Sequence, residues 1–132
     1  MNEWDRNIAW RQGHALRHED AQALGLLDED DETSIAIIVS HDCDLANEPA
    51  VEPYAEIIQG NLLAEQNGSH AHGKNPRKLH LHLIIDGKPK VCELIAAKKQ
   101  ILEKDKLVKF LPDPNISLAP EALRTLQHWL AL

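Results

Sequence analysis

The feature that most constrains this chain is a pair of segments joined by an Asp-Gly dipeptide. Leucine occupies every second position near the start of Lys78–Ile85, a period-two pattern that is typical of a strand with one buried face. Asp86-Gly87 follows, and this dipeptide suits the two central positions of a tight hairpin turn. Residues 88–95 can then return beside the first strand. The sequence therefore predicts an antiparallel β-hairpin.

The remaining apolar pattern predicts further strands. The run 34–40 is apolar on both faces and rich in β-branched residues, which favours a central, buried strand. Weaker patterns predict strands at 10–16 with Gly13 at a bend, at 54–59 closed by Gly60, and at 107–111.

Apolar residues at helical spacing predict two or three short helices. One spans 18–27, where Gly25 weakens or ends it, and one spans 96–103. The last starts near Leu118, with Ser117 as its N-cap and Pro120 in its first turn. Together the elements predict an α+β domain built around a small, curled antiparallel β-barrel with a C-terminal helix.

Size and composition suggest an ordinary globular protein. The 132 residues fit a single domain spanning 1–132, with 43% hydrophobic and 27% charged residues. No apolar run approaches the roughly 20 residues that cross a bilayer, and the N-terminus lacks the pattern of a signal peptide. We therefore expect a cytoplasmic protein with no membrane partner and with reduced cysteines.

The segment after the buried strand carries several reactive side chains. His41, Cys43 and Asp44 lie where a strand ends, a place where scaffolds often present functional groups. A cysteine beside a histidine can act as an activated thiolate, in catalysis or in a thiol sensor. The alternative is that Cys43 is buried as a small hydrophobe, while the two aspartates act as turn and cap residues that accept hydrogen bonds from backbone N–H groups.

Histidines make a second cluster. Four of them, His70, His72, His80 and His82, fall within a short stretch, and the last two share one face of the predicted hairpin strand. Two imidazoles placed in this way can share a zinc ion, with the 41–44 segment or Glu93 completing the ligands. The alternative is a polar strand face turned to solvent.

A basic run precedes the hairpin. Lys74 and Arg77 in this run are candidates for binding phosphate or a nucleic-acid backbone. Aromatic residues that would stack on bases are only 4% of the chain, and the net charge is −7. Nucleic-acid binding is therefore possible but not favoured.

Longer stretches resemble known proteins. Arg11-Gln12-Gly13-His14, the run 35–45 ending in Ser40-His41-Asp42-Cys43-Asp44-Leu45, Glu52-Pro53-Tyr54, and 72–77 are similar to a family of small uncharacterised bacterial proteins. In that family a strand ends in a Ser/Gln-x-Cys-Asp type motif, and longer members continue beyond the point that resembles 126–130. The resemblance implies a bacterial origin, and either a short member or an N-terminal domain.

A weaker similarity is to the SH3-like barrel of MazF/PemK-type toxins. There an Arg-x-Gly-Asp strand is followed by a Pro-Val-Val-Ile-Ser type strand; here His14 stands in place of the Asp, and 36–40 lacks the Pro. This similarity implies an SH3-like fold more than it implies ribonuclease activity.

Two functional hypotheses follow. The first is a binding or regulatory module that acts through a protein partner, or by self-association, at the C-terminal helix, whose end carries Trp129, Leu130 and Leu132. The second is a phosphodiester hydrolase, either metal-assisted or MazF-like. In it a zinc- or histidine-activated nucleophile from the 41–44 segment attacks, and Arg77 stabilises the developing charge.

Overall fold

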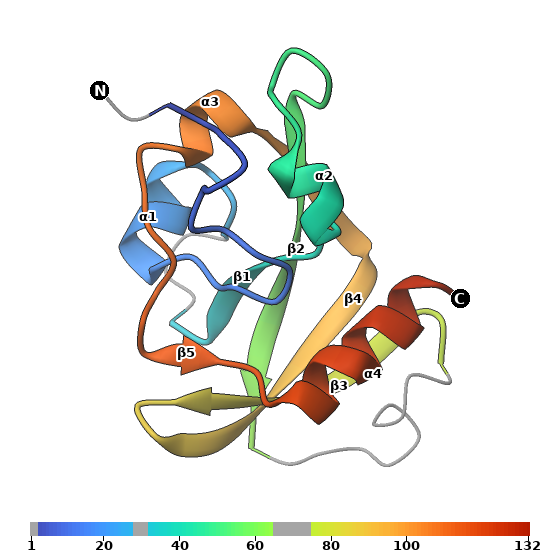
Figure 1. Cartoon of the computed structure of the whole chain (residues 1–132). Coiled ribbons are helices and arrows are strands. Elements are labelled where there is room, and N and C mark those ends of the chain that lie inside the picture. Colours follow the sequence, from blue (N-terminus) through green and yellow to red (C-terminus); the bar gives the residue numbers. More distant parts are fainter. Residues whose placement is uncertain (1–2, 28–31, 65–74) are drawn as a thin grey trace.

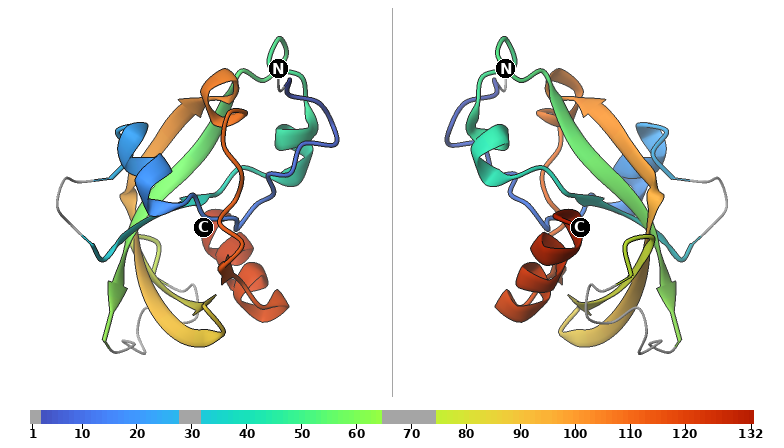
Figure 2. Two further views of the ribbon diagram at one scale, coloured as in Figure 1. Left: turned by 90° about the vertical axis from the view of Figure 1, so that its left-hand side faces the viewer. Right: turned by 90° about the vertical axis from the view of Figure 1, so that its right-hand side faces the viewer.

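Five strands of this protein form one antiparallel sheet in the order β1-β2-β4-β3-β5, which curls into a half-barrel (Figures 1 and 2). The computed structural model describes residues 3–27, 32–64 and 75–132. Its elements are α1 (His18–Ala23), β1 (Ser34–Ile38), α2 (Asp42–Ala46), β2 (Tyr54–Leu63), β3 (Lys78–Ile85), β4 (Lys88–Glu103), α3 (Lys104–Leu107), β5 (Ile116–Ser117) and α4 (Pro120–Leu130). The α+β class, the curled antiparallel sheet and the C-terminal helix are as predicted.

The predicted hairpin is confirmed. β3 and β4 pair from Ile85↔Lys88 outward, and the two residues between them, Asp86 and Gly87, have φ angles of 52° and 78°. Positive φ at both central positions is the requirement of a type I′ turn, whose twist matches that of the paired strands.

β4 is longer than predicted. Residues 96–103 continue the strand instead of forming a helix, and 99–103 pair with the first half of β2. Cross-strand pairing has overridden the helix propensity of Ala, Lys and Gln in this stretch. β2 also runs past Gly60, where its register shifts. A Cβ atom on Gly60 would lie 2.6 Å from the Cys92 sulfur, so glycine permits close strand packing instead of ending the strand.

β1 is buried along its whole length, as predicted, but it lies at an edge of the sheet and not at its centre. The segment 13–16 covers that edge, since the Gly13 N–H donates to the Ile38 carbonyl at 2.8 Å and the Leu16 N–H to the Ala36 carbonyl at 3.0 Å. The predicted strand at 10–16 is therefore reduced to two isolated bridges, from Ala15 to Ile37 and from Leu16 to Pro112. The bend at Gly13 is confirmed by its φ of 91°.

Helix boundaries differ from prediction at two further places. The segment 107–111 is not a strand. Its first residue, Leu107, is the fully buried last residue of α3, and a turn follows it. Ser117 lies in β5, and the N-cap of α4 is Ala119, with Pro120 in the first turn as predicted. α1 ends at Ala23, just before Gly25, whose φ is 72°.

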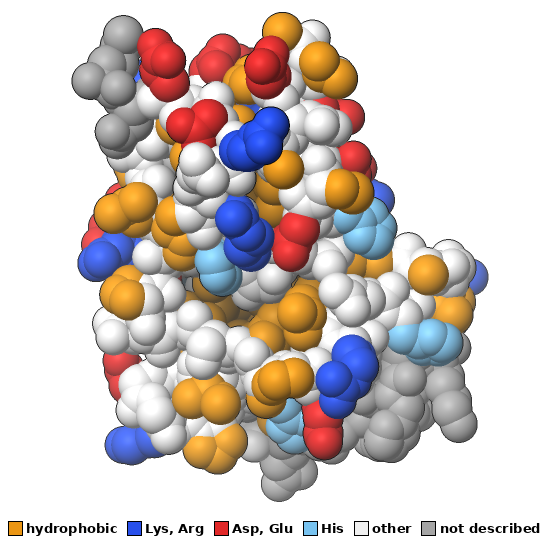
Figure 3. Space-filling view, viewed as in Figure 1, with side chains coloured by type: hydrophobic (Ala, Val, Ile, Leu, Met, Phe, Trp, Pro, Cys, Tyr) orange, Lys and Arg blue, Asp and Glu red, His pale blue; other side chains and the backbone are white. Residues whose placement is uncertain are grey.

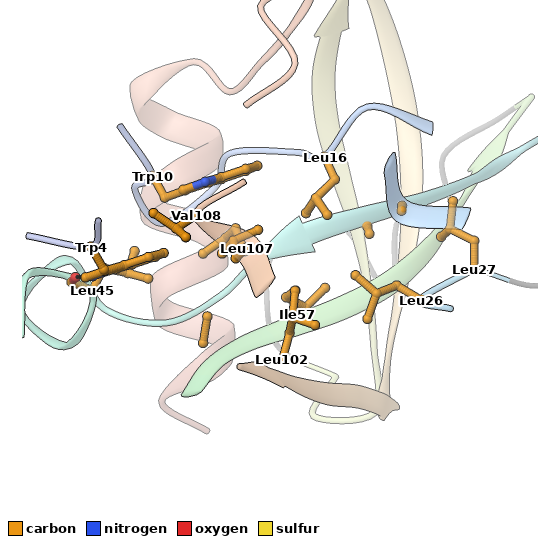
Figure 4. Packing of buried hydrophobic residues seen from close by; sticks show 14 residues of the cluster. Trp4, Trp10, Leu16, Leu26, Leu27, Leu45, Ile57, Leu102, Leu107 and Val108 are labelled. Atoms are coloured by element: carbon orange, nitrogen blue, oxygen red, sulfur yellow. Dashed lines mark hydrogen bonds between the residues drawn. The ribbon is translucent and has the colours of Figure 1, made fainter. Parts of the chain in front are cut away.

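Two hydrophobic clusters lie on the two faces of β1. One gathers Ala36 and Ile38 with the N-terminal segment, α1, α2 and α3, and Figure 4 shows its packing. The other gathers Ile35 and Ile37 with β3 and with the buried face of α4. No described helix has both the length and the apolar character needed to cross a membrane.

Candidate functional site

A groove of about 630 Å³ opens between the 9–14 loop, the start of α2, the 111–118 segment and α4. Its walls are mainly apolar, with Leu111, Pro112, Ile116, Leu118 and Leu123 among the lining side chains. One end is polar and is formed by Arg11, His14 and Asp42. In Figure 3 a hollow with hydrophobic walls lies between α4 and the segment that leads into β5.

Gly13 allows the groove to form. Its φ of 91° is readily reached by glycine, and it turns the loop back along β1. A Cβ atom here would lie 2.7 Å from Cδ1 of Leu118 and 3.2 Å from Cδ1 of Leu123. These two leucines therefore pack directly against the loop backbone, and they line the groove there.

Gln12 connects the loop to three other elements. Its backbone N–H donates to Oδ1 of Asp42 at 2.7 Å, and its side-chain amide donates to the Val39 carbonyl at 2.9 Å. Its side-chain oxygen accepts a hydrogen bond from Gln127 of α4 at 3.0 Å. Gln12 is only 6% exposed, and these bonds satisfy the polar groups that it buries. The loop, the end of β1, α2 and α4 are therefore held together at one residue.

His14 is held as a neutral ring at the polar end of the groove. Its Nδ1 accepts the backbone N–H of Arg11 at 3.0 Å, and its ring meets Trp10 edge-on at 6.4 Å. Burial lowers the pKa of His14, and the charge of Arg11 lowers it further, against opposing contributions from Asp42 and the Ala9 backbone. The ring therefore favours the neutral form that the hydrogen bond to Nδ1 requires.

Two buried side chains, Lys104 and Trp4, donate hydrogen bonds to backbone carbonyls in and just after α2. Lys104 is fully buried, and its Nζ donates to the carbonyls of Asp44 at 2.6 Å and Asn47 at 3.0 Å. The indole of Trp4 donates to the Leu45 carbonyl at 2.7 Å, and the Lys104 ammonium lies 5.3 Å from the same ring. These donors satisfy carbonyls that the end of a short helix leaves open.

Burial also lowers the pKa of Lys104, and the carboxylates of Glu52 and Asp44 oppose that shift. This role could not be predicted from sequence, because Lys104 stands in a run of charged residues that is typical of solvated surface. Gln12 and Trp4 were likewise not predicted as site residues. For Gln12, the only sequence signal was its place next to Gly13 in the Arg-Gln-Gly-His motif.

Two predicted site residues line a second, smaller hollow. His41 and Asp44 border a space of about 260 Å³ together with Glu52, Glu56 and Leu130. The structure therefore brings the 41–44 segment and the end of the C-terminal helix to one place. Asp42, in the same segment, faces the larger groove instead.

Cys43 is exposed and lines neither hollow, so the interpretation of it as a buried hydrophobe is wrong. The companion interpretation, that the two aspartates act as turn and cap residues, is not what the structure shows at Asp42: its carboxylate accepts the N–H of Gln12 from a distant loop, and the N-cap residue of α2 is His41. The other cysteine, Cys92, is fully buried, and burial raises its pKa to about 12.

The predicted metal and phosphate ligands lie elsewhere. His80 is buried, with its Nε2 2.9 Å from Oε2 of Glu93, and His82 is exposed. Both lie on the face of β3 opposite the leucines that pack under α4. Within residues 3–27, 32–64 and 75–132, no group of three or more His, Cys, Asp or Glu side chains is placed to hold a metal ion.

Arg77 is exposed, and its backbone N–H donates to the side chain of Asn75 at 2.9 Å. It lines neither the groove nor the smaller hollow. Lys74, His70 and His72 lie outside the described residues.

Comparisons with protein-family models, with curated proteins and with solved structures found no match to this chain.

Proposed function

We propose that this protein is a binding module that holds a short apolar segment of a protein partner in the groove beside α4. The observation that carries the proposal is the groove itself: a volume of about 630 Å³ with mainly apolar walls, among whose lining residues are also Arg11, His14 and Asp42. Ligand sites in proteins commonly have this make-up and volumes of roughly 300–1,000 Å³.

The walls suit an apolar partner. Pro112 and Pro114 restrict the backbone of one wall, so little conformational freedom remains to be lost on binding. Leu111 is 64% exposed at the rim, where a partner side chain would cover it. At the polar end, Arg11 and Asp42 are held by bonds within the protein through Nη1 and Oδ1, and their other nitrogens and oxygen would bind the main chain of a peptide.

Composition supports a protein partner over a nucleic acid. The net charge of −7 opposes a polyanion, and none of the described residues that line the groove is a Phe, Tyr or Trp on which bases could stack. The hydrolase hypothesis gains no support from the polar end. Its catalytic candidates His41, Cys43 and Asp44 and its metal candidates His80 and His82 are not among the described residues that line the groove.

We place the partner at the groove and not at the C-terminal end of α4. Leu126 and Trp129 of α4 belong to the chain's own core, and the Trp129 indole donates to the Asn75 carbonyl at 2.7 Å. Of the apolar residues that motivated the earlier hypothesis, Leu132 remains 58% exposed. A docking surface at that end would be small.

The test is a selection of short peptides from a displayed random library, followed by calorimetric titration of the enriched sequences. We expect Leu111→Asp to weaken binding by more than about tenfold, because it puts a charge where an apolar contact forms. The matched control is Ile101→Asp. Ile101 is 62% exposed on β4 and lines neither hollow, so binding should be unchanged. Enriched peptides that bind Leu111→Asp as well as the wild type would refute the groove as the site, and so would failure to enrich any peptide.

A further inference from the structure

We propose that His14 makes the groove sensitive to pH, so that protonation of its ring opens the polar end and weakens ligand binding there. This inference rests on the proposed function for its effect on a ligand. Its structural part concerns the free protein and can be tested without one.

The hydrogen bond that His14 Nδ1 accepts is incompatible with a protonated ring. The Arg11 N–H donates to that atom at 3.0 Å, so the nitrogen must carry a lone pair and not a proton. Protonation would set two N–H donors against each other across the same gap. It would also place a positive ring beside the Arg11 guanidinium, which the carbonyls of Ile8 and Trp10 hold nearby. The ring could not keep its present position.

The charged groups around the ring act in both directions. Arg11 in the same loop opposes protonation, and Asp42 on α2 favours it, as does the hydrogen bond to the Ala9 backbone. Asp113 lines the opposite wall of the groove. Burial adds to the effect of Arg11, so the pKa of His14 in the folded protein lies below its ordinary value of 6.5. The neutral ring's contribution is therefore complete above pH 6.5 and is lost as the pH falls through the folded pKa.

His14 is linked to the groove on two sides, through its backbone and through its ring. On one side the His14 carbonyl accepts the Ile38 N–H at 2.8 Å, and the adjacent Gly13 packs under Leu118. On the other side the ring touches Trp10, whose indole donates to the Phe110 carbonyl at 3.2 Å, next to Leu111 on the rim. If the ring moves, we therefore expect the backbone near Gly13, the packing of Leu118 and the position of Leu111 to change together.

The test begins with the free protein. Nuclear magnetic resonance would follow the His14 ring and the backbone amides of Gln12, Gly13 and Leu111 between about pH 8 and pH 5. We expect these amides to shift with the same midpoint as the His14 ring, and that midpoint to lie below 6.5. His14→Gln keeps an acceptor for the Arg11 N–H but does not titrate, so the shifts should vanish. His18→Gln, on α1 and outside the groove, should leave them unchanged.

A ligand selected for the groove supplies the second readout. If it binds the neutral form, the wild-type affinity should fall by up to about tenfold for each pH unit below the His14 midpoint. His14→Gln should bind with the same affinity across the range, and His18→Gln should follow the wild type. Groove amides that do not move with the His14 ring would overturn the inference. An equal loss of affinity in His14→Gln would overturn it as well. If no peptide binds at any pH, the proposed function fails, while the titration of the free protein still decides the role of His14.

Discussion

At the scale of single residues, the two cysteines occupy opposite environments. Cys43 is exposed on α2, whereas Cys92 is fully buried under the β2–β4 pairing, where desolvation and the nearby Glu93 raise its pKa to about 12. A thiolate, not a thiol, is the nucleophile towards thiol reagents. The native protein should therefore expose one reactive thiol.

We predict that a colorimetric disulfide reagent at neutral pH modifies one cysteine quickly in the native protein and two after denaturation. Cys43→Ser should abolish the fast reaction and leave the slow one. Fast modification of both thiols in the native state would show that Cys92 is not enclosed in the way the structure describes.

Lys104 makes the sharpest prediction for stability. Lys104→Met keeps most of the side-chain volume but leaves the Asp44 and Asn47 carbonyls without this donor, and we expect a loss of about 2 kcal/mol in the free energy of unfolding. The matched control is Lys106→Met on the same helix, where the side chain is 59% exposed and forms only a surface ion pair. Its effect should stay within about 0.5 kcal/mol, measured by urea denaturation. A Lys104→Met protein as stable as the control would contradict the role assigned to the ammonium.

Alanine substitutions at Gly13 and Gly25 distinguish the cost of backbone strain from the cost of a packing clash. Both have positive φ, 91° and 72°, but a Cβ atom on Gly13 would meet Leu118 while one on Gly25 would meet nothing within 4 Å. Gly25→Ala should cost about 1 kcal/mol of stability from the left-handed backbone alone. Gly13→Ala should cost more, by the price of displacing Leu118, and thermal unfolding of the two variants would measure the difference. Equal costs would mean that the loop does not pack on α4 as tightly as the structure shows.

At the scale of elements, α2 lies between the two hollows and the 11–16 segment closes the sheet edge beside it. Asp42 of α2 faces the groove, while Asp44 faces the smaller hollow. The 11–16 segment lines the groove, and within it the backbone carbonyl of His14 accepts the N–H of Ile38 in β1. The integrity of the groove and the protection of the β1 edge should therefore be lost together.

Hydrogen exchange can test that coupling. In Gln12→Ala the side-chain bonds to Val39 and Gln127 are absent. We expect the amides of Gly13 and Ile38 to exchange at least about tenfold faster, because local opening then costs less free energy. Amides of the β3–β4 hairpin serve as the internal reference, since the hydrogen bonds of Gln12 run to Val39, Asp42 and Gln127. Uniform acceleration across both regions would indicate global destabilisation instead of release of the edge.

The elements also show which parts of the fold can be read from sequence. The hairpin was predictable because alternation and an Asp-Gly turn are local signals that its own residues carry. The second half of β4 was not, because residues such as Lys99 and Gln100 have helical preference and become strand only through pairing with β2. The edge position of β1 was missed for a related reason: the 13–16 segment buries a sheet edge as fully as a neighbouring strand would.

At the scale of the whole molecule, the site could be predicted only in fragments. The sequence singled out the 41–44 segment and the Arg-Gln-Gly-His motif separately, and the fold places Asp42 beside Arg11 and His14. The apolar walls of the groove come from 111–118 and α4, about a hundred residues away from that motif in sequence. Neither periodicity nor spacing carries information about such distant contacts, and the buried donor Lys104 is hidden for the same reason.

If a partner docks in the groove beside α4, a selected peptide should perturb the residues that line it. Backbone amide shifts of this protein, mapped as the peptide is added, test this. We expect the largest shifts at Gln12, Gly13, Leu118 and Leu123. Shifts concentrated instead around His41, Glu52 and Leu130, or spread over no common surface, would contradict it.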